Sequence, residues 1–150
     1  MPNWIEGTLK IRGEESNVRA FIENALKPCA GRYENDPDHF VQKLDYEGYS
    51  ISADTYVDET NRMFVADDCE LYFYEDEFYY FIPIKQAWGF QKEDFVQISK
   101  KYNLDLRITG FERGMEFAEE IEVIQGLCTI DRVIEYSDYR WECPCPTLGG

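Results

Sequence analysis

Hydrophobic and polar residues alternate with a period of two near the start of the chain. Between Trp4 and Arg12, every second position is apolar or glycine, at Ile5, Gly7, Leu9 and Ile11. This pattern predicts a half-buried strand that Gly13 ends. A helix is predicted next, with Ser16 as its N-cap and Pro28 preventing its continuation. Its buried stripe consists of Val18, Phe21, Ile22, Ala25 and Leu26.

The second half of the chain has equally clear patterns. A strand is predicted from Glu77 to Lys85; its run from Phe78 to Ile82 is apolar on both faces, which predicts a central strand, and Pro83 predicts that its far end leaves the ladder. Lys92 to Tyr102 has helical spacing, and Asn103 suits a left-handed C-cap. Alternation then predicts three strands at 104–109, 115–125 and 127–136, the last two forming a hairpin at Gly126.

The middle of the chain is less regular. Residues 28–38 are rich in turn-forming residues and predict a loop. Short strands are expected at 40–44, 49–53, 63–66 and 70–74. The whole order predicts one α+β domain over residues 1–140, a ferredoxin-like antiparallel sheet with two helices, an acidic strand-rich insert at about 39–77 and a C-terminal hairpin. Residues 141–150 are expected to form a flexible tail.

Three short motifs resemble small phage and prophage proteins. They are Met1-Pro2-Asn3-Trp4 with the strand and Gly13 that follow, an aromatic strand ending in Trp88, and the turn Glu112-Arg113-Gly114. Together they resemble the Api92-like group, over about residues 1–26 and 78–125, although Gly89-Phe90-Gln91 stands where prolines are expected. The resemblance implies a phage or mobile-element origin and a ferredoxin-like domain. It implies no reaction and no catalytic residue.

Composition narrows the classes of function. The 150 residues include 30 Asp and Glu against 15 Lys and Arg, a net charge of −15. That balance argues against direct binding of nucleic acid or an anionic membrane, while a hydrophobic content of 44% suffices for a core. The start of the chain has no secretory pattern, so we expect a cytoplasmic protein (in the host cell, given the phage resemblance) with reduced cysteines. The oligomeric state stays open.

The acidity is concentrated in two segments. Residues 45–80 contain eleven acids and one base, and residues 111–122 contain five acids and one base. Such clustering favours a surface that attracts a basic partner. The predicted partner-binding residues are Asp54, Asp58, Glu59, Asp67, Asp68, Glu70, Tyr72, Tyr74, Glu75, Asp76, Glu77, Glu112, Glu116, Glu119 and Glu120.

These observations favour a non-enzymatic inhibitor that mimics DNA and has no cofactor. Its partner would be a host protein with a basic nucleic-acid-binding surface, such as a nuclease or a CRISPR effector. One alternative is an interaction or assembly module that uses Trp88, Phe90 and the tyrosine-rich strand. Another is a metal-dependent hydrolase built on Asp67, Asp68 and Glu70.

Other candidate chemistry is weaker. The single histidine, His39, follows Asp36 and Asp38 and can be interpreted as part of a metal site or as a polar loop. Cys143-Pro144-Cys145 resembles half of a zinc site but lacks a second pair, so incidental thiols are favoured. Glu119-Glu120-x-Glu122 can bind a hard cation or form a solvated strand face. Carboxylates beside Tyr72 to Tyr80 disfavour RNA binding.

Overall fold

The computed structural model describes residues 2–29, 40–45, 47–74 and 79–150. Within them the chain is an α+β protein with an eight-stranded antiparallel sheet and a small three-stranded sheet. The large sheet has the order β11-β10-β9-β1-β8-β6-β5-β2, and the small sheet the order β3-β4-β7. The strands of the large sheet are β1 (Trp4–Arg12), β2 (Leu26–Lys27), β5 (Tyr56–Val57), β6 (Met63–Val65), β8 (Tyr80–Ala87), β9 (Asp105–Glu112), β10 (Phe117–Ile124) and β11 (Leu127–Glu135). Those of the small sheet are β3 (Val41–Leu44), β4 (Gly48–Ile51) and β7 (Cys69–Tyr72).

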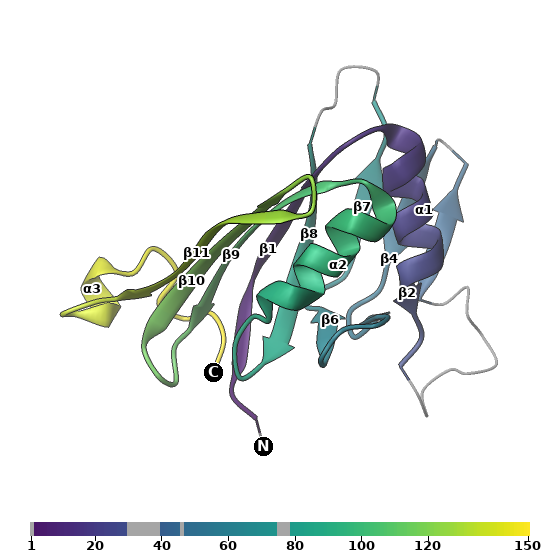
Figure 1. The fold of residues 1–150 in the computed structure, drawn as a ribbon. Helices are drawn as coiled ribbons and strands as arrows, with labels where there is room; N and C mark the ends of the chain where they lie inside the picture. The colour runs from purple at the N-terminus through teal and green to yellow at the C-terminus, as the bar shows by residue number, and fades with distance from the viewer. Residues whose placement is uncertain (1, 30–39, 46, 75–78) are drawn as a thin grey trace.

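Two helices of similar length cover one face of the large sheet. They are α1 (Glu15–Ala25) and α2 (Lys92–Tyr102); in Figure 1, α2 lies in front of the central strand β8, and α1 lies to its side, toward β2 and the small sheet. The core between helices and sheet is apolar and closely packed, and includes Ile5, Leu9, Ile11, Phe21, Ile22, Ile82, Ile84, Phe95, Leu106, Ile108 and Val123. These are the inward positions of the predicted alternation, so the period-two and helical patterns locate the core as expected.

The sequence predicts both ends of α2 correctly but not the start of α1. The α2 bounds agree with the prediction, and Asn103 has φ 54° and ψ 55° and donates its N–H to the Ser99 carbonyl. The predicted N-cap Ser16 is wrong, because the extended residue before the helix is Glu14 and Ser16 already lies within the first turn. Backbone N–H groups of the first turn bond to the Glu14 carbonyl, and no side chain caps this end.

The prediction that the chain leaves the sheet at Pro83 is also wrong. β8 continues to Ala87 and pairs with β1 on one side and with β6 on the other. The carbonyl of Pro83 accepts from Ala66 N, one residue beyond the end of β6. Because the N and C=O of a strand residue point to the same side, the missing N–H of Pro83 faces this end of β6 and costs no bond to β1.

The remaining strands follow the sequence patterns with shifted ends. β8 is central, as predicted, and the start predicted for it at Glu77 lies outside the described residues. The hairpin of β10 and β11 turns at Gln125 and Gly126, which have φ of 50° and 77°. β2 and β5 are two-residue strands that the sequence did not predict, and they extend the large sheet beyond β6.

The segment for which we predicted a flexible tail contacts the rest of the chain. A short helix, α3 (Tyr139–Glu142), precedes it, and Cys143 is buried. Gly150 N donates to the Trp4 carbonyl at 2.8 Å, so the two ends of the chain lie close together (Figure 1). Within the described residues, no helix is both long and apolar enough to cross a membrane.

Candidate functional site

The small sheet is attached to α1 through its inner face. Tyr49 and Leu71 lie opposite each other on β4 and β7 and are buried. The Tyr49 hydroxyl donates to Glu23 Oε1 at 2.6 Å, and Arg19 lies over the Phe73 ring at 4.1 Å from its centroid. Burial of the hydroxyl raises the pKa of Tyr49, and its hydrogen bond to Glu23 raises this pKa further by a smaller amount. The inner face is therefore fixed, and the opposite face remains available to a partner.

We call that opposite face the outer face of the small sheet; it consists of Gln42, Leu44, Gly48, Ser50, Glu70 and Tyr72, with Tyr74 beyond the end of β7. The Tyr72 ring lies close against Gly48: a Cβ added at position 48 would stand only 2.7 Å from the ring. The rings of Tyr72 and Tyr74 are 5.9 Å apart at an angle of 31°. Tyr74 is 64% exposed, and the Glu70 carboxylate accepts from the Tyr72 hydroxyl.

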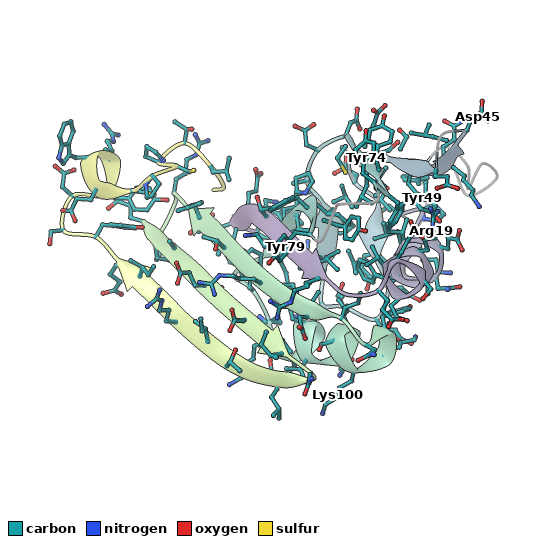
Figure 2. All side chains as sticks on the ribbon, turned by 90° about the horizontal axis from the view of Figure 1, so that it is seen from above. Arg19, Asp45, Tyr49, Tyr74, Tyr79 and Lys100 are labelled. Carbon is teal, nitrogen blue, oxygen red and sulfur yellow. The ribbon has the colours of Figure 1, made fainter. Side chains whose placement is uncertain are left out.

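Two further carboxylates lie at the same end of the small sheet. Asp45 and Glu47 belong to the turn between β3 and β4, and both are exposed. The Glu47 carbonyl accepts from Phe73 N at 3.2 Å, which places this turn beside the stacked tyrosines. Figure 2 shows Asp45 and Tyr74 on this side of the molecule, with Lys100 of α2 on the opposite side. The arrangement presents aromatic rings between carboxylates.

Several predicted acids of the insert stabilise local structure instead. Asp68 Oδ1 accepts from Ala53 N at 2.8 Å, and Asp67 Oδ1 accepts from Asp68 N at 2.9 Å. Asp54 forms an ion pair with Lys85 at 2.7 Å. These carboxylates fold the loops that connect β4, β6 and β7, so only part of their charge is offered to a partner.

Asp58 and Glu59 lie elsewhere, beside the helices. Asp58 N donates to the Ala25 carbonyl at the end of α1, and the Asp58 side chain is exposed. Glu59 pairs with Lys101 of α2 at 3.1 Å across an exposed surface. The structure therefore separates these two acids from the outer face of the small sheet.

The acids predicted in the second segment do not join the small sheet either. Glu112 is 1% exposed, and its carboxylate accepts from Gly114 N and Met115 N at 2.7 and 2.8 Å, which forms the turn before β10. Glu116 stands in the same turn, exposed, with φ 60°.

The other two predicted acids of this segment are on β10. Glu119 Oε2 accepts from Phe90 N at 2.9 Å, and burial raises the pKa of Glu119. Glu120 forms an ion pair with Arg132 of β11. Because each carboxylate has a local partner, this segment contributes much less free charge than its composition suggests.

The remaining candidates are placed as follows. Glu75, Asp76 and Glu77 lie outside the described residues, as does His39. Of the pair proposed for an interaction module, Trp88 is 64% exposed whereas Phe90 is buried against Phe95. Phe90 is therefore a core residue and not a contact residue.

No metal-binding cluster forms in the described part of the chain. There, no three His, Cys, Asp or Glu side chains come together in a way that would hold an ion, and Asp67, Asp68 and Glu70 do not converge. Cys143 is buried and Cys145 half-buried next to α3. Burial and the nearby Asp68 and Asp67 raise the pKa of Cys69 to about 11, so this thiol stays protonated at neutral pH.

Comparisons with known proteins add no relative. No protein-family model, no curated protein and no solved structure matches the chain.

Proposed function

We propose that this chain is a non-enzymatic binding protein that recognises a basic surface of a partner through the outer face of the small sheet. The partner class we propose is a host protein that binds nucleic acid, such as a nuclease or a CRISPR effector, and the origin we propose is a phage or mobile element. The inhibitor that the sequence predicts would then contact its partner through fewer residues, those of the outer face of the small sheet.

The observation that carries the proposal is the pair of tyrosines between carboxylates. Tyr74 is 64% exposed and lies beside the Tyr72 ring, the Tyr72 hydroxyl donates to Glu70, and the exposed Asp45 and Glu47 belong to the turn whose Glu47 carbonyl accepts from Phe73 N. An arginine of a partner gains a cation–π contact from a tyrosine ring and a charge-assisted bond from a neighbouring carboxylate. Tyrosine is also enriched among the residues that dominate binding energy.

The charge of the surrounding segment supports the same partner. Residues 40–74 contain eight acids and two bases, and of the acids Asp45, Glu47, Asp58 and Asp67 are exposed without an ion pair among the described residues. A potential of this sign increases the association rate of a basic protein and repels nucleic acid. Competition for the partner's nucleic-acid site follows from both effects.

We also propose that the centre of the large sheet has the ferredoxin-like plan. Six of the elements occur along the chain in the order β1, α1, β6, β8, α2 and β9. In the sheet, the four strands among them are neighbours in the order β9-β1-β8-β6. In that plan the fourth strand is next to the first, followed by the third and the second, with all neighbours antiparallel and both helices on one face. The hairpin partner strands β10 and β11, the short strands β5 and β2 and the small sheet are then additions.

The test uses capture followed by competition. The immobilised protein is exposed to host lysate at low salt, bound proteins are eluted with rising salt, and each eluted protein is purified and tested for binding to DNA with and without the chain. We expect basic nucleic-acid-binding proteins that elute with salt and lose DNA when the chain is added. Captured proteins that are not basic, or DNA binding that the chain leaves unchanged, would refute the proposal.

A pair of variants locates the contact. Glu70→Lys combined with Tyr74→Ser should weaken the captured partner's affinity at least tenfold, or about 1.4 kcal/mol. Glu135→Lys, which makes the same change of charge on exposed β11, should change the affinity less than threefold. Equal losses in the two variants would show that only the net charge matters and not this surface.

A further inference from the structure

The large sheet has a second face that the helices do not cover. Along β1, the residues between the buried Ile5, Leu9 and Ile11 point to this side, and the partner registers extend it across the neighbouring strands. We call it the open face. Its five longest strands present five bases and four acids there, namely Lys10, Arg12, Lys85, Arg107 and Arg132 with Glu6, Asp105, Glu120 and Glu122. In a chain of net charge −15, this face is the exception.

Three of the bases are adjacent at one end of the open face. Lys10 on β1 stands directly opposite Arg107 on β9, and Arg12 is the next residue of β1 on the same side. Like charges opposite one another on neighbouring strands destabilise a sheet. Arg12 pairs with Asp105 at 2.7 Å and Arg107 with Glu122 at 2.6 Å.

Lys10 differs from its two neighbours. Its ammonium group has no carboxylate partner among the described residues. It lies instead over two rings, 5.3 Å from the centroid of Phe81 and 5.7 Å from that of Tyr79. Phe81 is 51% exposed and Tyr79 44% exposed, although both belong to the segment of the central strand β8. An uncompensated cation is thus held between two accessible aromatic rings.

Lys10 and Tyr79 border a groove of about 220 Å³, and Phe81 lies next to Lys10 outside the lining of the groove. Lys10, Arg12 and Arg107 line it together with Tyr79, while Asp105 and Glu122 neutralise two of the three cations. Figure 2 shows Tyr79 over the sheet, away from Tyr74 and Asp45 of the small sheet. The groove and the outer face of the small sheet are therefore different surfaces.

We propose that this groove binds a small anion that carries one planar ring, a ligand of the mononucleotide class. The anionic group would lie at the Lys10 ammonium and the neighbouring guanidinium groups, where charge-assisted bonds are available. The ring would lie against Tyr79, which lines the groove, and beside exposed Phe81, as bases stack on exposed aromatic side chains of a sheet. The anionic half would use Lys10, the lysine of this groove that has no carboxylate partner among the described residues.

Charge and size favour a single nucleotide over a polynucleotide. A polynucleotide that ran past the groove would bring further phosphates close to the carboxylates of Asp105 and Glu122, which line it, and these phosphates would be repelled. The groove of about 220 Å³ is also smaller than the roughly 300–1,000 Å³ that is typical of sites for small molecules. It would therefore hold one phosphate and part of one ring, and the rest of the nucleotide would lie outside it.

The experiment is a titration of the full chain with 5′-AMP, followed by backbone amide NMR shifts and by calorimetry. We expect shifts at residues of β1, β8 and β9 around the groove, and weaker binding of adenosine and of inorganic phosphate by at least fivefold each. Lys10→Gln and Phe81→Leu should each weaken 5′-AMP binding at least fivefold. Lys27→Gln, which removes an exposed lysine from β2, should leave the affinity unchanged.

Other outcomes overturn the inference. Shifts outside the open face, or full affinity in Lys10→Gln, would show that the groove is not the site. Inorganic phosphate as tight as 5′-AMP would remove the role of the rings, and an oligouridylate much tighter than 5′-AMP would make the ligand a nucleic acid strand. Variants of Glu70 and Tyr74 should leave 5′-AMP binding unchanged, so this result and the capture experiment fail independently.

Discussion

A buried network of amide and carboxylate groups joins β8, the start of α2 and the loop before β6. The Gln86 side chain is fully buried. Its Nε2 donates to the Asn61 carbonyl at 2.9 Å and to Asp94 Oδ2 at 2.8 Å, and its Oε1 accepts from Gln91 N at 3.0 Å. Asp94 also accepts from Asn61 N at 2.9 Å. We predict that Gln86→Leu is the most informative single test of this packing.

The magnitude follows from the partners that the substitution leaves behind. Leucine fills a similar volume, but Asn61 O and Gln91 N lose their hydrogen bonds inside the protein and Asp94 loses one of two. Each polar group left without a partner at this part-buried site costs about 1–3 kcal/mol, and the burial of leucine returns about 1.5–3 kcal/mol. We therefore expect a net loss of roughly 2–4 kcal/mol in the free energy of unfolding.

Urea unfolding followed by circular dichroism measures this loss. With a slope of about 2 kcal/mol per molar urea, the midpoint should fall by about 1–2 M. Gln97→Leu is the matched control, because Gln97 lies exposed on α2, and it should change the free energy of unfolding by less than about 0.5 kcal/mol. A loss below about 1 kcal/mol in Gln86→Leu would refute the view that these bonds fix the start of α2 to the sheet.

Three further outcomes are expected from single residues. Burial raises the pKa of Glu119 in the folded state, so ionisation of Glu119 opposes folding and the stability should fall as the pH rises through that raised pKa. In Glu119→Gln, the midpoint of urea unfolding should therefore depend less on pH than in the original protein. Parallel curves of midpoint against pH for the two proteins would contradict this. Gly48→Ala should lower stability by about 1–3 kcal/mol in thermal unfolding and displace Tyr72, since the added Cβ would stand 2.7 Å from the Leu71 carbonyl oxygen. A thiol reagent at pH 8 should modify exposed Cys128 well before Cys69, whose pKa is about 11, and Cys128→Ser should remove the fast phase.

Local patterns predicted the central elements well. The bounds of β1 and α2 agree with the sequence because each has a full hydrophobic period and end signals within a few residues, such as Asn103. The short strands β2 and β5 have only two residues each, and their pairing depends on contact between Leu26 and Val57, which are far apart in the chain. No local signal reports such a contact, so these strands were missed.

Pro83 illustrates a different limit. A proline in a strand removes one donor, and the sequence cannot show whether that donor would have faced a neighbouring strand. Here β6 ends at Val65, and beyond it only the Pro83 carbonyl forms a hydrogen bond among the described residues, with Ala66 N, so the strand tolerates the proline in the middle of the sheet. The error arose from topology and not from local propensity.

The candidate site was predicted in part for the same reason. Composition locates the acidic segments but not the partners of each carboxylate, which come from other strands: Glu120 meets Arg132, and Glu122 meets Arg107. The groove at Lys10 has a weak sequence signal, since Lys10 and Arg12 occupy the polar side of the first alternating strand. Their cross-strand neighbours Arg107 and Phe81 became apparent only from the register.

The cross-strand pairs also explain how one acidic chain presents two unlike surfaces. On the open face, arginines of β9 and β11 neutralise the carboxylates of β10, so the excess negative charge of the chain is displaced toward the segment of the small sheet. Because the excess negative charge lies away from the groove, the electrostatic potential at Lys10 and Arg107 is not strongly negative. Removing one arginine, as in Arg107→Gln, would leave Glu122 without its ion-pair partner and remove the net positive charge of the groove. It should therefore weaken the proposed binding of 5′-AMP and leave the proposed recognition of a basic partner through Tyr74 intact.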